Sequence, residues 1–565
     1  MATPKKEIPR VGVFVCHCGI NIGGVVKVSE VVEFAKTIPD VAYAEANLYT
    51  CSSEGISKIK EAIKKYNLNR VVVASCTPRT HEPLFRNACE EAGLNKYLFE
   101  MANIRDQCSW AHMHEPEKAT TKAKDLVKMA VAKARLLEPQ DEPEIDVTPS
   151  ALVIGGGISG MTAALSMANQ GFNVNIVERE PELGGMLAKL HMLCPNFEDA
   201  SKALSSIVDA VKSNQKINVL TSSEVEDVKG FIGNFDVTVK KDDKPLKLNQ
   251  GTIVVATGAE NFEPINMYGY KSNENVLTQM QLEKLLKTGD LRKPDKVVMI
   301  QCVGAREEKG RQYCSRICCG VAIKNALIIK DLYPETELFI IFRDLQTYGQ
   351  EYEACYTEAR EKGVHFIKYT SSNPPEVSSN SEGKLTIKTY DAFLKEMVEL
   401  ESDLVVLSTP LIPQKDAEKL SKILKVPLGS DGFFFEAHVK LRPIDFATDG
   451  IFVCGSAHSP KDISESISQA LGVASRAAIP MANKHVRADA ITSIINEDLC
   501  SGCGTCVRIC PYGAIQKNEI GIAQVTSVVC KGCGTCAASC PEKAITMRHF
   551  TDDQITAQAL AALEG

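Results

Sequence analysis

The sequence lacks the features that mark membrane, secreted and nucleic-acid-binding proteins. It contains no run of about 18 apolar residues, and its basic start turns polar before an apolar stretch of signal-peptide length. No long basic run offsets the formal net charge of -7, which disfavours nucleic acid as a partner. No catalytic dyad or triad is apparent. These absences predict a cytoplasmic protein without a membrane span.

The composition is that of a soluble globular chain with an unusual number of thiols. Hydrophobic residues make up 44% and charged residues 24% of its 565 residues, which is enough chain for several domains. The chain also contains 21 cysteines. Reducing compartments keep thiols reduced, so clustered cysteines in a cytoplasmic protein usually hold metal or perform redox chemistry. Iron is the metal that this pattern favours.

The C-terminal end carries the most specific motif. The segments "LCSGCGTCVRICP" and "VCKGCGTCAASCP" both read C-x2-C-x2-C-x3-C-P. In this arrangement three cysteines of one motif and the fourth of the other hold each [4Fe-4S] cluster. A pair of zinc ribbons fits less well, because zinc sites use two ligand pairs. The predicted ligand sets are Cys500, Cys503, Cys506 and Cys540 for one cluster, and Cys530, Cys533, Cys536 and Cys510 for the other.

A glycine-rich turn predicts a dinucleotide site. The segment "ALVIGGGISGMTAALSMANQGFNVNIVERE" reads as strand, glycine turn, helix and second strand. Gly155, Gly157 and Gly160 supply the tight turn, the approach to a pyrophosphate and the close helix packing. Glu178, which ends the second strand, is placed to bind ribose hydroxyls.

With its neighbouring motifs, this turn resembles the FAD domain of the thioredoxin reductase and disulfide oxidoreductase superfamily. "ELGG", "TIVVATGA" and "GIFVCGSAH" are the accompanying motifs. Ser456 stands where that superfamily usually has an acidic residue, which weakens the expected ribityl contact. The other residues predicted to bind FAD are Ser159, Arg179, Gly184, Gly185, Met186, Thr257, Gly258 and Gly455.

In that superfamily a second, nicotinamide-binding unit is inserted in the FAD domain, here at roughly residues 293–410. Its expected glycine turn is replaced by "QCVGAREEKGRQYCSRICCG", so we infer that NAD(P)H binding is lost. Cys302, Cys314, Cys318 and Cys319 are predicted to hold a cluster beside the flavin, near Arg311 and Arg316; buried structural cysteines are the alternative.

Lys324 follows these cysteines on the predicted helix. Two interpretations stay open: a catalytic lysine that points at the flavin, or a solvated helix lysine.

The N-terminal 140 residues form a separate predicted α/β unit. "VGVFVC", "VAYAEANLYTC", "RVVVASC" and "YLFEMANIRDQC" read as parallel strands that end in cysteines, and the carboxyl ends of parallel strands share one edge. Four of these cysteines would suffice for a cluster, whereas core cysteines are the alternative. The candidate cluster ligands are Cys16, Cys18, Cys51, Cys76 and Cys108, and periodicity does not show which four of them bind the cluster. His17 and His81 lie near this edge, and Cys89, Cys194 and Cys355 are interpreted as structural.

Linkers at "LLEPQDEPEIDVTPS" and "ANKHVRADAITSIINEDLC" divide the chain into three predicted domains. They are an N-terminal parallel α/β domain (1–140), a thioredoxin-reductase-like FAD domain (149–488) and a two-cluster ferredoxin domain (489–565).

This order of domains, with "CHCG", "SCTPRTHEP", "NIRDQCSW" and the C-x11-C-x3-CC insert, resembles the A subunit of cytosolic heterodisulfide reductase of methanogens and related archaea. That family is understood to bifurcate electrons at FAD between the disulfide of coenzymes M and B and ferredoxin. The resemblance implies an oxidoreductase of methanogenesis. The implied partners are B-type and C-type reductase subunits, hydrogenase or formate dehydrogenase subunits, ferredoxin and a second copy of the chain. Some members carry an additional ferredoxin module, but no second cysteine-rich run occurs between Glu178 and Cys302.

Three other functions share parts of this pattern. A flavin and iron-sulfur conduit without bifurcation shares every motif above. An NAD(P)H oxidoreductase of the glutamate synthase small-subunit type conflicts with the missing second glycine turn. A scaffold has no need of a complete FAD site. The absence of a C-x2-C or C-x4-C pair beside the flavin indicates that a partner reduces the disulfide.

Overall fold

A computed structural model describes residues 7–242, 244–379 and 384–563. The chain divides into two compact units, residues 1–144 with 487–565 (unit 1) and residues 145–486 (unit 2). Unit 1 combines the segments predicted as the N-terminal and ferredoxin domains, and the first six and last two residues of those predicted ranges lie outside the described residues. None of the described helices combines the length and apolar character that a membrane crossing requires.

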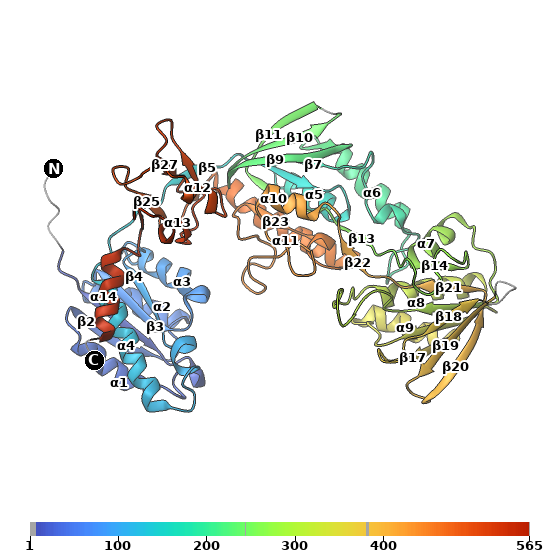
Figure 1. The fold of residues 1–565 in the computed structure, drawn as a ribbon, viewed down its shortest axis with the longest axis horizontal. Helices are drawn as coiled ribbons and strands as arrows, with labels where there is room; N and C mark the ends of the chain where they lie inside the picture. Colours follow the sequence, from blue (N-terminus) through green and yellow to red (C-terminus); the bar gives the residue numbers. More distant parts are fainter. Residues whose placement is uncertain (1–6, 243, 380–383, 564–565) are drawn as a thin grey trace. The chain divides into compact units, whose positions relative to one another are not determined.

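The first part of unit 1 is a four-stranded parallel sheet in the order β2-β1-β3-β4 (Figure 1). Its central strands are continuous apolar runs because helices cover the sheet, and the predicted parallel α/β fold is confirmed. The strands are β1 (Val11–Cys16), β2 (Val41–Asn47), β3 (Arg70–Ser75) and β4 (Phe99–Asn103). The helices are α1 (Val28–Thr37), α2 (Ser53–Lys65), α3 (Pro78–Glu91) and α4 (Pro116–Ala134).

The second part of unit 1 consists of two small antiparallel strand pairs, two short helices and a longer C-terminal helix. Strand β25 (Ser493–Ile495) pairs with β28 (Ile545–Met547), and β26 (Ile515–Lys517) pairs with β27 (Ala523–Val525). Short helices α12 (Thr505–Ile509) and α13 (Thr535–Ala538) follow the cysteine loops. Helix α14 (Asp552–Leu563) packs along α4 (Figure 1).

Buried polar contacts join the two parts of unit 1. The carboxylate of Glu100 on β4 lies 2.8 Å from Lys133 Nζ and 3.3 Å from His549 Nε2. Lys133 Nζ also lies 3.9 Å from the ring centre of Phe550. Because a buried carboxylate is stable only when paired, β4 and the segment before α14 hold each other in place.

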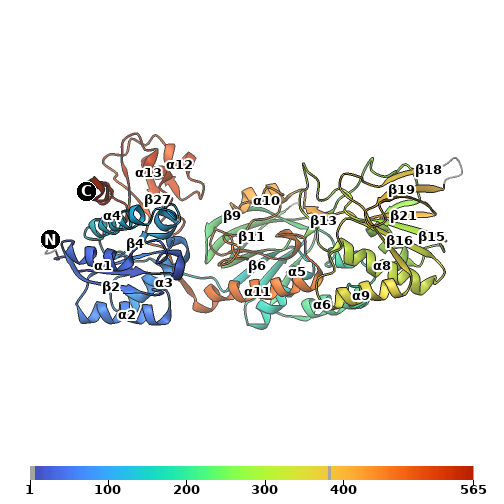
Figure 2. The ribbon, with the colours of Figure 1, turned by 90° about the horizontal axis from the view of Figure 1, so that it is seen from below.

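Unit 2 contains a five-stranded parallel sheet in the order β23-β12-β6-β7-β8. Helices α5 (Ile158–Asn169) and α11 (Ile463–Asn483) pack on one face, and an antiparallel layer covers the other (Figure 2). The sheet strands are β6 (Ser150–Ile154), β7 (Asn173–Val177), β8 (Ile217–Leu220), β12 (Thr252–Val255) and β23 (Ile451–Val453). The covering layer is β9 (Ser223–Phe231), β10 (Asn234–Lys241) and β11 (Lys244–Gln250), with α10 (Ala417–Leu424) beside it; α6 (Ala200–Ser213) packs against α5.

A second five-stranded parallel sheet, in the order β14-β21-β15-β16-β17, forms the insert of unit 2. It begins before residue 293, because β14 pairs with β21. Its strands are β14 (Val276–Thr278), β15 (Lys296–Ile300), β16 (Glu337–Phe342), β17 (Val364–Lys368) and β21 (Leu404–Leu407). Its helices are α7 (Gln279–Thr288), α8 (Cys318–Leu332) and α9 (Gln350–Glu361), and its second layer is β18 (Glu376–Ser379), β19 (Leu385–Asp391) and β20 (Glu396–Ser402).

Two strands connect the insert to the first sheet. Strand β13 (Ala259–Asn261) leaves the first sheet after β12, and β22 (Leu411–Pro413) returns beside it in antiparallel pairing. Each sheet has an apolar core on both of its faces. Each sheet therefore has its own core, and this two-stranded link carries the chain between them.

Candidate functional site

The predicted flavin turn lies between β6 and α5. Gly155 has a φ of +110°, and a Cβ atom there would lie 2.4 Å from the Ala256 carbonyl oxygen. At Gly160 a Cβ atom would lie 1.9 Å from the Gly155 carbonyl oxygen, so only glycine lets α5 approach the strand this closely. Gly157 differs, because nothing lies within 4 Å of its Cβ position. This free space at the N-terminus of α5 fits a pyrophosphate.

Glu178 is fixed by the same turn. Its buried carboxylate accepts hydrogen bonds from the backbone N–H of Gly156 at Oε2 (2.6 Å) and of Glu180 at Oε1 (2.9 Å). Each carboxylate oxygen can accept a second hydrogen bond, so Glu178 keeps capacity for ribose hydroxyls.

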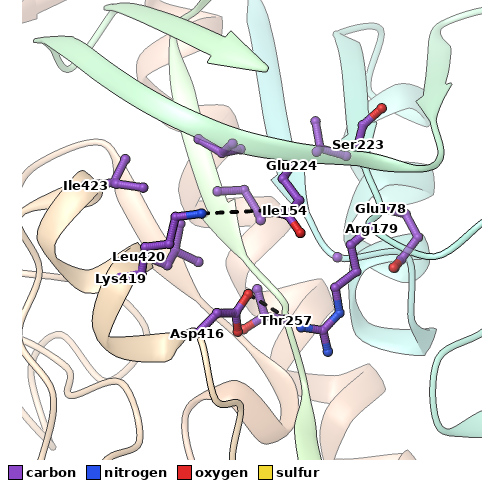
Figure 3. Close-up of a pocket in the computed structure, with 13 residues that line it drawn as sticks. Ile154, Glu178, Arg179, Ser223, Glu224, Thr257, Asp416, Lys419, Leu420 and Ile423 are labelled. Atoms are coloured by element: carbon purple, nitrogen blue, oxygen red, sulfur yellow. Dashed lines mark hydrogen bonds and ion pairs between the residues drawn. The ribbon is translucent and has the colours of Figure 1, made fainter. Parts of the chain in front are cut away.

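A groove with about 570 Å³ of space, open solvent included, lies beside this turn (Figure 3). Arg179 Nη2 donates to Gln414 Oε1 (2.6 Å), and Arg179 Nη1 lies 3.4 Å from Asp416 Oδ2. Lys419 Nζ on α10 lies 3.6 Å from a carboxylate oxygen of Glu224 on β9. Sequence reasoning missed Asp416, Lys419 and Glu224, because these groove residues come from segments without a motif.

The remaining residues predicted to bind FAD lie on segments around the turn. Gly184 N–H donates to the Gly156 carbonyl (2.9 Å), which holds "ELGG" against the glycine turn. Gly455 N–H donates to Gln469 Oε1 (2.9 Å) on α11. Ser159 lies on α5, and Gly184, Gly185 and Met186 lie in the loop after β7. Thr257 and Gly258 follow β12, and Gly455 and Ser456 follow β23.

Two cavities of unit 1 are lined by the predicted ferredoxin cysteines. Each cavity takes three cysteines from one motif and the fourth from the other. Backbone N–H groups of Ala514 and Ala544 donate to Cys510 Sγ and Cys540 Sγ, both at 3.3 Å. With open solvent included, the space lined by Cys500, Cys503, Cys506 and Cys540 is about 340 Å³, and that lined by Cys510, Cys530, Cys533 and Cys536 is about 320 Å³.

The structure also brings together the four cysteines of the loop between β15 and α8. Cys318 interacts electrostatically with Cys319, Cys314 and Cys302. Burial raises the pKa of Cys318 well above its usual value and that of Cys319 to about 12. Buried thiols of this kind lose their protons when a cation such as iron is bound, and the N-terminus of α8 favours the resulting negative charge. The donor set therefore fits an iron-sulfur cluster.

This loop holds an unusual backbone conformation. Cys302, Arg306 and Arg316 have φ values of +63°, +56° and +63°, which cost non-glycine residues about 1 to 3 kcal/mol each. Arg316 Nη2 donates to the Pro460 carbonyl (2.8 Å) and to Glu465 Oε2 (3.1 Å). These contacts fasten the cysteine loop to the first turn of α11.

Lys324 is buried, so its interpretation as a solvated helix lysine is wrong. Only 2% of its side chain is exposed, and Nζ pairs with Glu283 on α7, which is 0% exposed. Lys324 Nζ also donates to the Met192 carbonyl (2.9 Å). The pair links the insert to the loop after β7, and contact between Lys324 and the flavin stays a prediction.

Four of the five N-terminal cysteines lie close together. Cys51 interacts electrostatically with Cys16 and Cys18, and Cys76 with Cys18 and Cys51. Cys108 instead donates from Sγ to the Ala119 carbonyl (3.0 Å). A short π-helix after β4 (Arg105–Ser109) carries Cys108, which is completely buried, and burial raises its pKa to about 11.

The other cysteines are buried or partly buried. Burial raises the pKa of Cys89, Cys194 and Cys454 to about 12. Cys355 Sγ donates to the Pro195 carbonyl (3.6 Å). Burial also lowers the pKa of His81, an effect that nearby Arg105 reinforces. Among the described residues, no His, Cys, Asp or Glu group is arranged to hold a single metal ion, whereas the clusters predicted above are larger than one ion.

Three family models match the chain. Residues 149–471 match the pyridine nucleotide-disulphide oxidoreductase family, and residues 493–516 and 529–544 match 4Fe-4S binding domains. The chain therefore carries FAD and [4Fe-4S] clusters, as the cofactor prediction stated. The predicted combination of a thioredoxin-reductase-like domain with a ferredoxin domain is confirmed.

Curated relatives match over the whole chain. The A subunit of the H(2):CoB-CoM heterodisulfide,ferredoxin reductase of Methanothermobacter thermautotrophicus is 39% identical over 100% of this chain and 99% of its own length. The chain belongs to the family of heterodisulfide reductase A subunits. The corresponding iron-sulfur protein of Methanocaldococcus jannaschii is 40% identical over 98% of this chain and 99% of its own. The A subunit of the H(2)/formate:CoB-CoM heterodisulfide,ferredoxin reductase of Methanococcus maripaludis is 35% identical over 90% of this chain and 91% of its own.

This membership makes the chain an oxidoreductase component that transfers electrons through flavin and iron-sulfur clusters. The alignment with the M. thermautotrophicus relative spans 657 residues, so that relative has segments which this shorter family member lacks. Among solved structures, the thioredoxin reductase of Lactococcus lactis is similar, with a TM-score of 0.43 and 16% identity over 60% of this chain and 100% of that chain.

Proposed function

We propose that this chain passes electrons from a hydrogenase or formate dehydrogenase partner through FAD to two acceptors. One acceptor is a heterodisulfide-reducing partner of the B and C subunit type, and the other is ferredoxin. The observation that carries this proposal is the cysteine group at the β15 to α8 loop, where the superfamily binds nicotinamide. The names of the relatives, which mention H2, formate and ferredoxin, support the choice of partners.

Each part of the chain has a separate task in this proposal. FAD supplies exchange of electrons in pairs or singly, and a [4Fe-4S] cluster supplies single-electron exchange. Gly157 and the N-terminus of α5 bind the pyrophosphate, and Glu178 orients the ribose. Arg316 holds the cysteine loop against α11, and Cys319 is the buried member of the four cysteines that would hold the cluster.

Coupling between the two acceptors tests the proposal. In the complete complex supplied with H2 or formate, ferredoxin reduction is expected only while heterodisulfide is also present. A conduit without bifurcation reduces either acceptor in the absence of the other, and that result would contradict the proposal. Neither NADH nor NADPH is expected to bleach the flavin, because the insert lacks the second glycine turn.

We also propose that Cys16, Cys18, Cys51 and Cys76 hold a further [4Fe-4S] cluster. Arg105 Nη1 lies 4.0 Å from Cys18 Sγ, and the guanidinium of Arg105 lies 4.7 Å from the ring centre of Trp110. Trp110 is the one tryptophan of the sequence. Its fluorescence therefore reports on this group of cysteines.

Changing Cys51 or Cys76 to serine is expected to lower the iron content by about four per chain, since one missing ligand prevents stable assembly. Trp110 fluorescence is expected to rise, because a cluster absorbs light in the range of tryptophan emission. Cys108→Ser is the matched control and is expected to change neither quantity. If the Cys51→Ser, Cys76→Ser and Cys108→Ser variants all kept the iron content of the parent protein, these cysteines would be structural.

A further inference from the structure

An arginine and an aspartate lie directly beside the cysteine group of the insert. Arg306 Nη2 donates to Asp344 Oδ2 at 2.8 Å. Arg306 also interacts electrostatically with Cys302 and with Cys319. The backbone carbonyl of Asp344 in turn accepts from Cys319 Sγ at 3.9 Å. Arg306 therefore lies near Cys302 and Cys319, and the backbone of its partner Asp344 contacts Cys319.

The fold holds Arg306 in this position against a backbone preference. Its φ of +56° is in the left-handed region, which non-glycine residues rarely occupy. Arg306 N–H donates to the Tyr313 carbonyl (3.2 Å), and the Arg306 carbonyl accepts from Arg343 Nη1 (3.0 Å). Arg343 Nη2 also donates to the Ala305 carbonyl (2.7 Å). Strained conformations that their surroundings enforce are concentrated at functional sites.

The same combination occurs at the N-terminal cysteine group. Arg105 Nε donates to Asp106 Oδ1 (3.1 Å), while Nη1 faces Cys18 Sγ. Cys18, like Cys302, has a positive φ, of +48°. The two sites belong to different sheets, so an arginine between an aspartate and a cysteine occurs at two separate places in the chain.

We propose that Arg306 raises the reduction potential of the cluster held by Cys302, Cys314, Cys318 and Cys319, and that Asp344 limits this increase. The inference rests on the proposed function, which places a cluster there. A reduced cluster carries one more negative charge than an oxidised cluster, and a neighbouring guanidinium stabilises that charge. Cys319 is buried and the other three cysteines are half-buried, so solvent screens this charge interaction only in part.

Charge substitutions with opposite signs test this assignment. The holoprotein is purified without oxygen, and the cluster potential is measured by redox titration with electron paramagnetic resonance. Arg306→Gln is expected to lower the equilibrium constant for cluster reduction at least tenfold, which is about 59 mV for one electron. Asp344→Asn is expected to raise the constant, and Arg306→Lys, which keeps the charge, to change it least.

A control separates this effect from a general loss of charge. Arg476 and Asp445 form a comparable pair in the same unit, in which Arg476 Nη2 donates to Asp445 Oδ1 at 2.7 Å. This hydrogen bond involves no cysteine. Arg476→Gln is expected to leave the potential unchanged. A purely structural role of Arg306 would not produce shifts of opposite sign in the Arg306→Gln and Asp344→Asn variants.

The iron content distinguishes failure of this inference from failure of the proposed function. The signal of this cluster is the one that a Cys318→Ala and Cys319→Ala variant loses. An unchanged potential in Arg306→Gln with full iron content would overturn the inference and leave the proposed function standing. If the Arg306→Gln variant does not assemble the cluster, the cluster potential of the Asp344→Asn variant is the test. A raised potential in that variant supports the inference, and an unchanged potential overturns it. Full iron content in the cysteine variant would overturn both.

Discussion

Replacing Cys318 and Cys319 with alanine is expected to remove about four irons per chain and leave FAD bound. The two cysteines begin α8, whereas the flavin turn lies between β6 and α5, on the other sheet of unit 2. All eight ferredoxin ligands lie in unit 1. The parent protein should contain roughly twelve to sixteen irons, from two ferredoxin clusters and one or two others.

Iron and flavin analysis with electron paramagnetic resonance measures this result. One paramagnetic signal should disappear, together with electron flow between the flavin and at least one external partner. Cys355→Ala is the matched control, because Cys355 is a buried cysteine of α9 in the same unit. A double variant with unchanged iron content and parental turnover would show that Cys318 and Cys319 are structural.

Changing Gly157 to valine is expected to weaken FAD binding at least tenfold, or by about 1.4 kcal/mol, without unfolding the protein. Gly157 has an extended backbone conformation, and nothing lies within 4 Å of its Cβ position. The protein alone therefore accommodates a side chain there. FAD does not, because its pyrophosphate has to approach this part of the backbone.

Gly160→Ala is the matched control for that prediction. Its Cβ atom would lie 1.9 Å from the Gly155 carbonyl oxygen, so overpacking should lower the free energy of unfolding by about 1 to 3 kcal/mol. Flavin absorbance after gel filtration and thermal unfolding of the flavin-free protein separate the two effects. Full flavin occupancy in Gly157→Val would contradict the assignment of this turn to FAD.

Sequence patterns predicted the parts of the site in which the functional residues lie within a few positions of one another in the chain. Gly155 and Gly160 are recognisable because a strand, a turn and a helix must meet within a few residues. The ferredoxin cysteines are recognisable for the same reason, and each set of four lines one cavity.

Contacts between distant segments were not predictable from the sequence. Lys324 resembles any helix lysine until Glu283, which is 41 residues away in the chain, is placed beside it. Arg306 and Asp344 are 38 residues apart. The position of Cys108 depends on a single π-helical turn after β4, which hydrophobic periodicity does not reveal.

The division of the chain into units has a consequence for its synthesis. Unit 2 interrupts unit 1, and its two ends lie together, since Val147 N–H donates to the Lys484 carbonyl at 2.8 Å. Such adjacent ends are what an inserted domain requires, and they allow unit 2 to fold on the ribosome as a closed body. The first half of unit 1 is synthesised earlier. The contact between Glu100 and His549 can form only after unit 2 has been translated, because His549 follows unit 2 in the chain. A nascent chain therefore completes its flavoprotein body first and joins the two halves of unit 1 last.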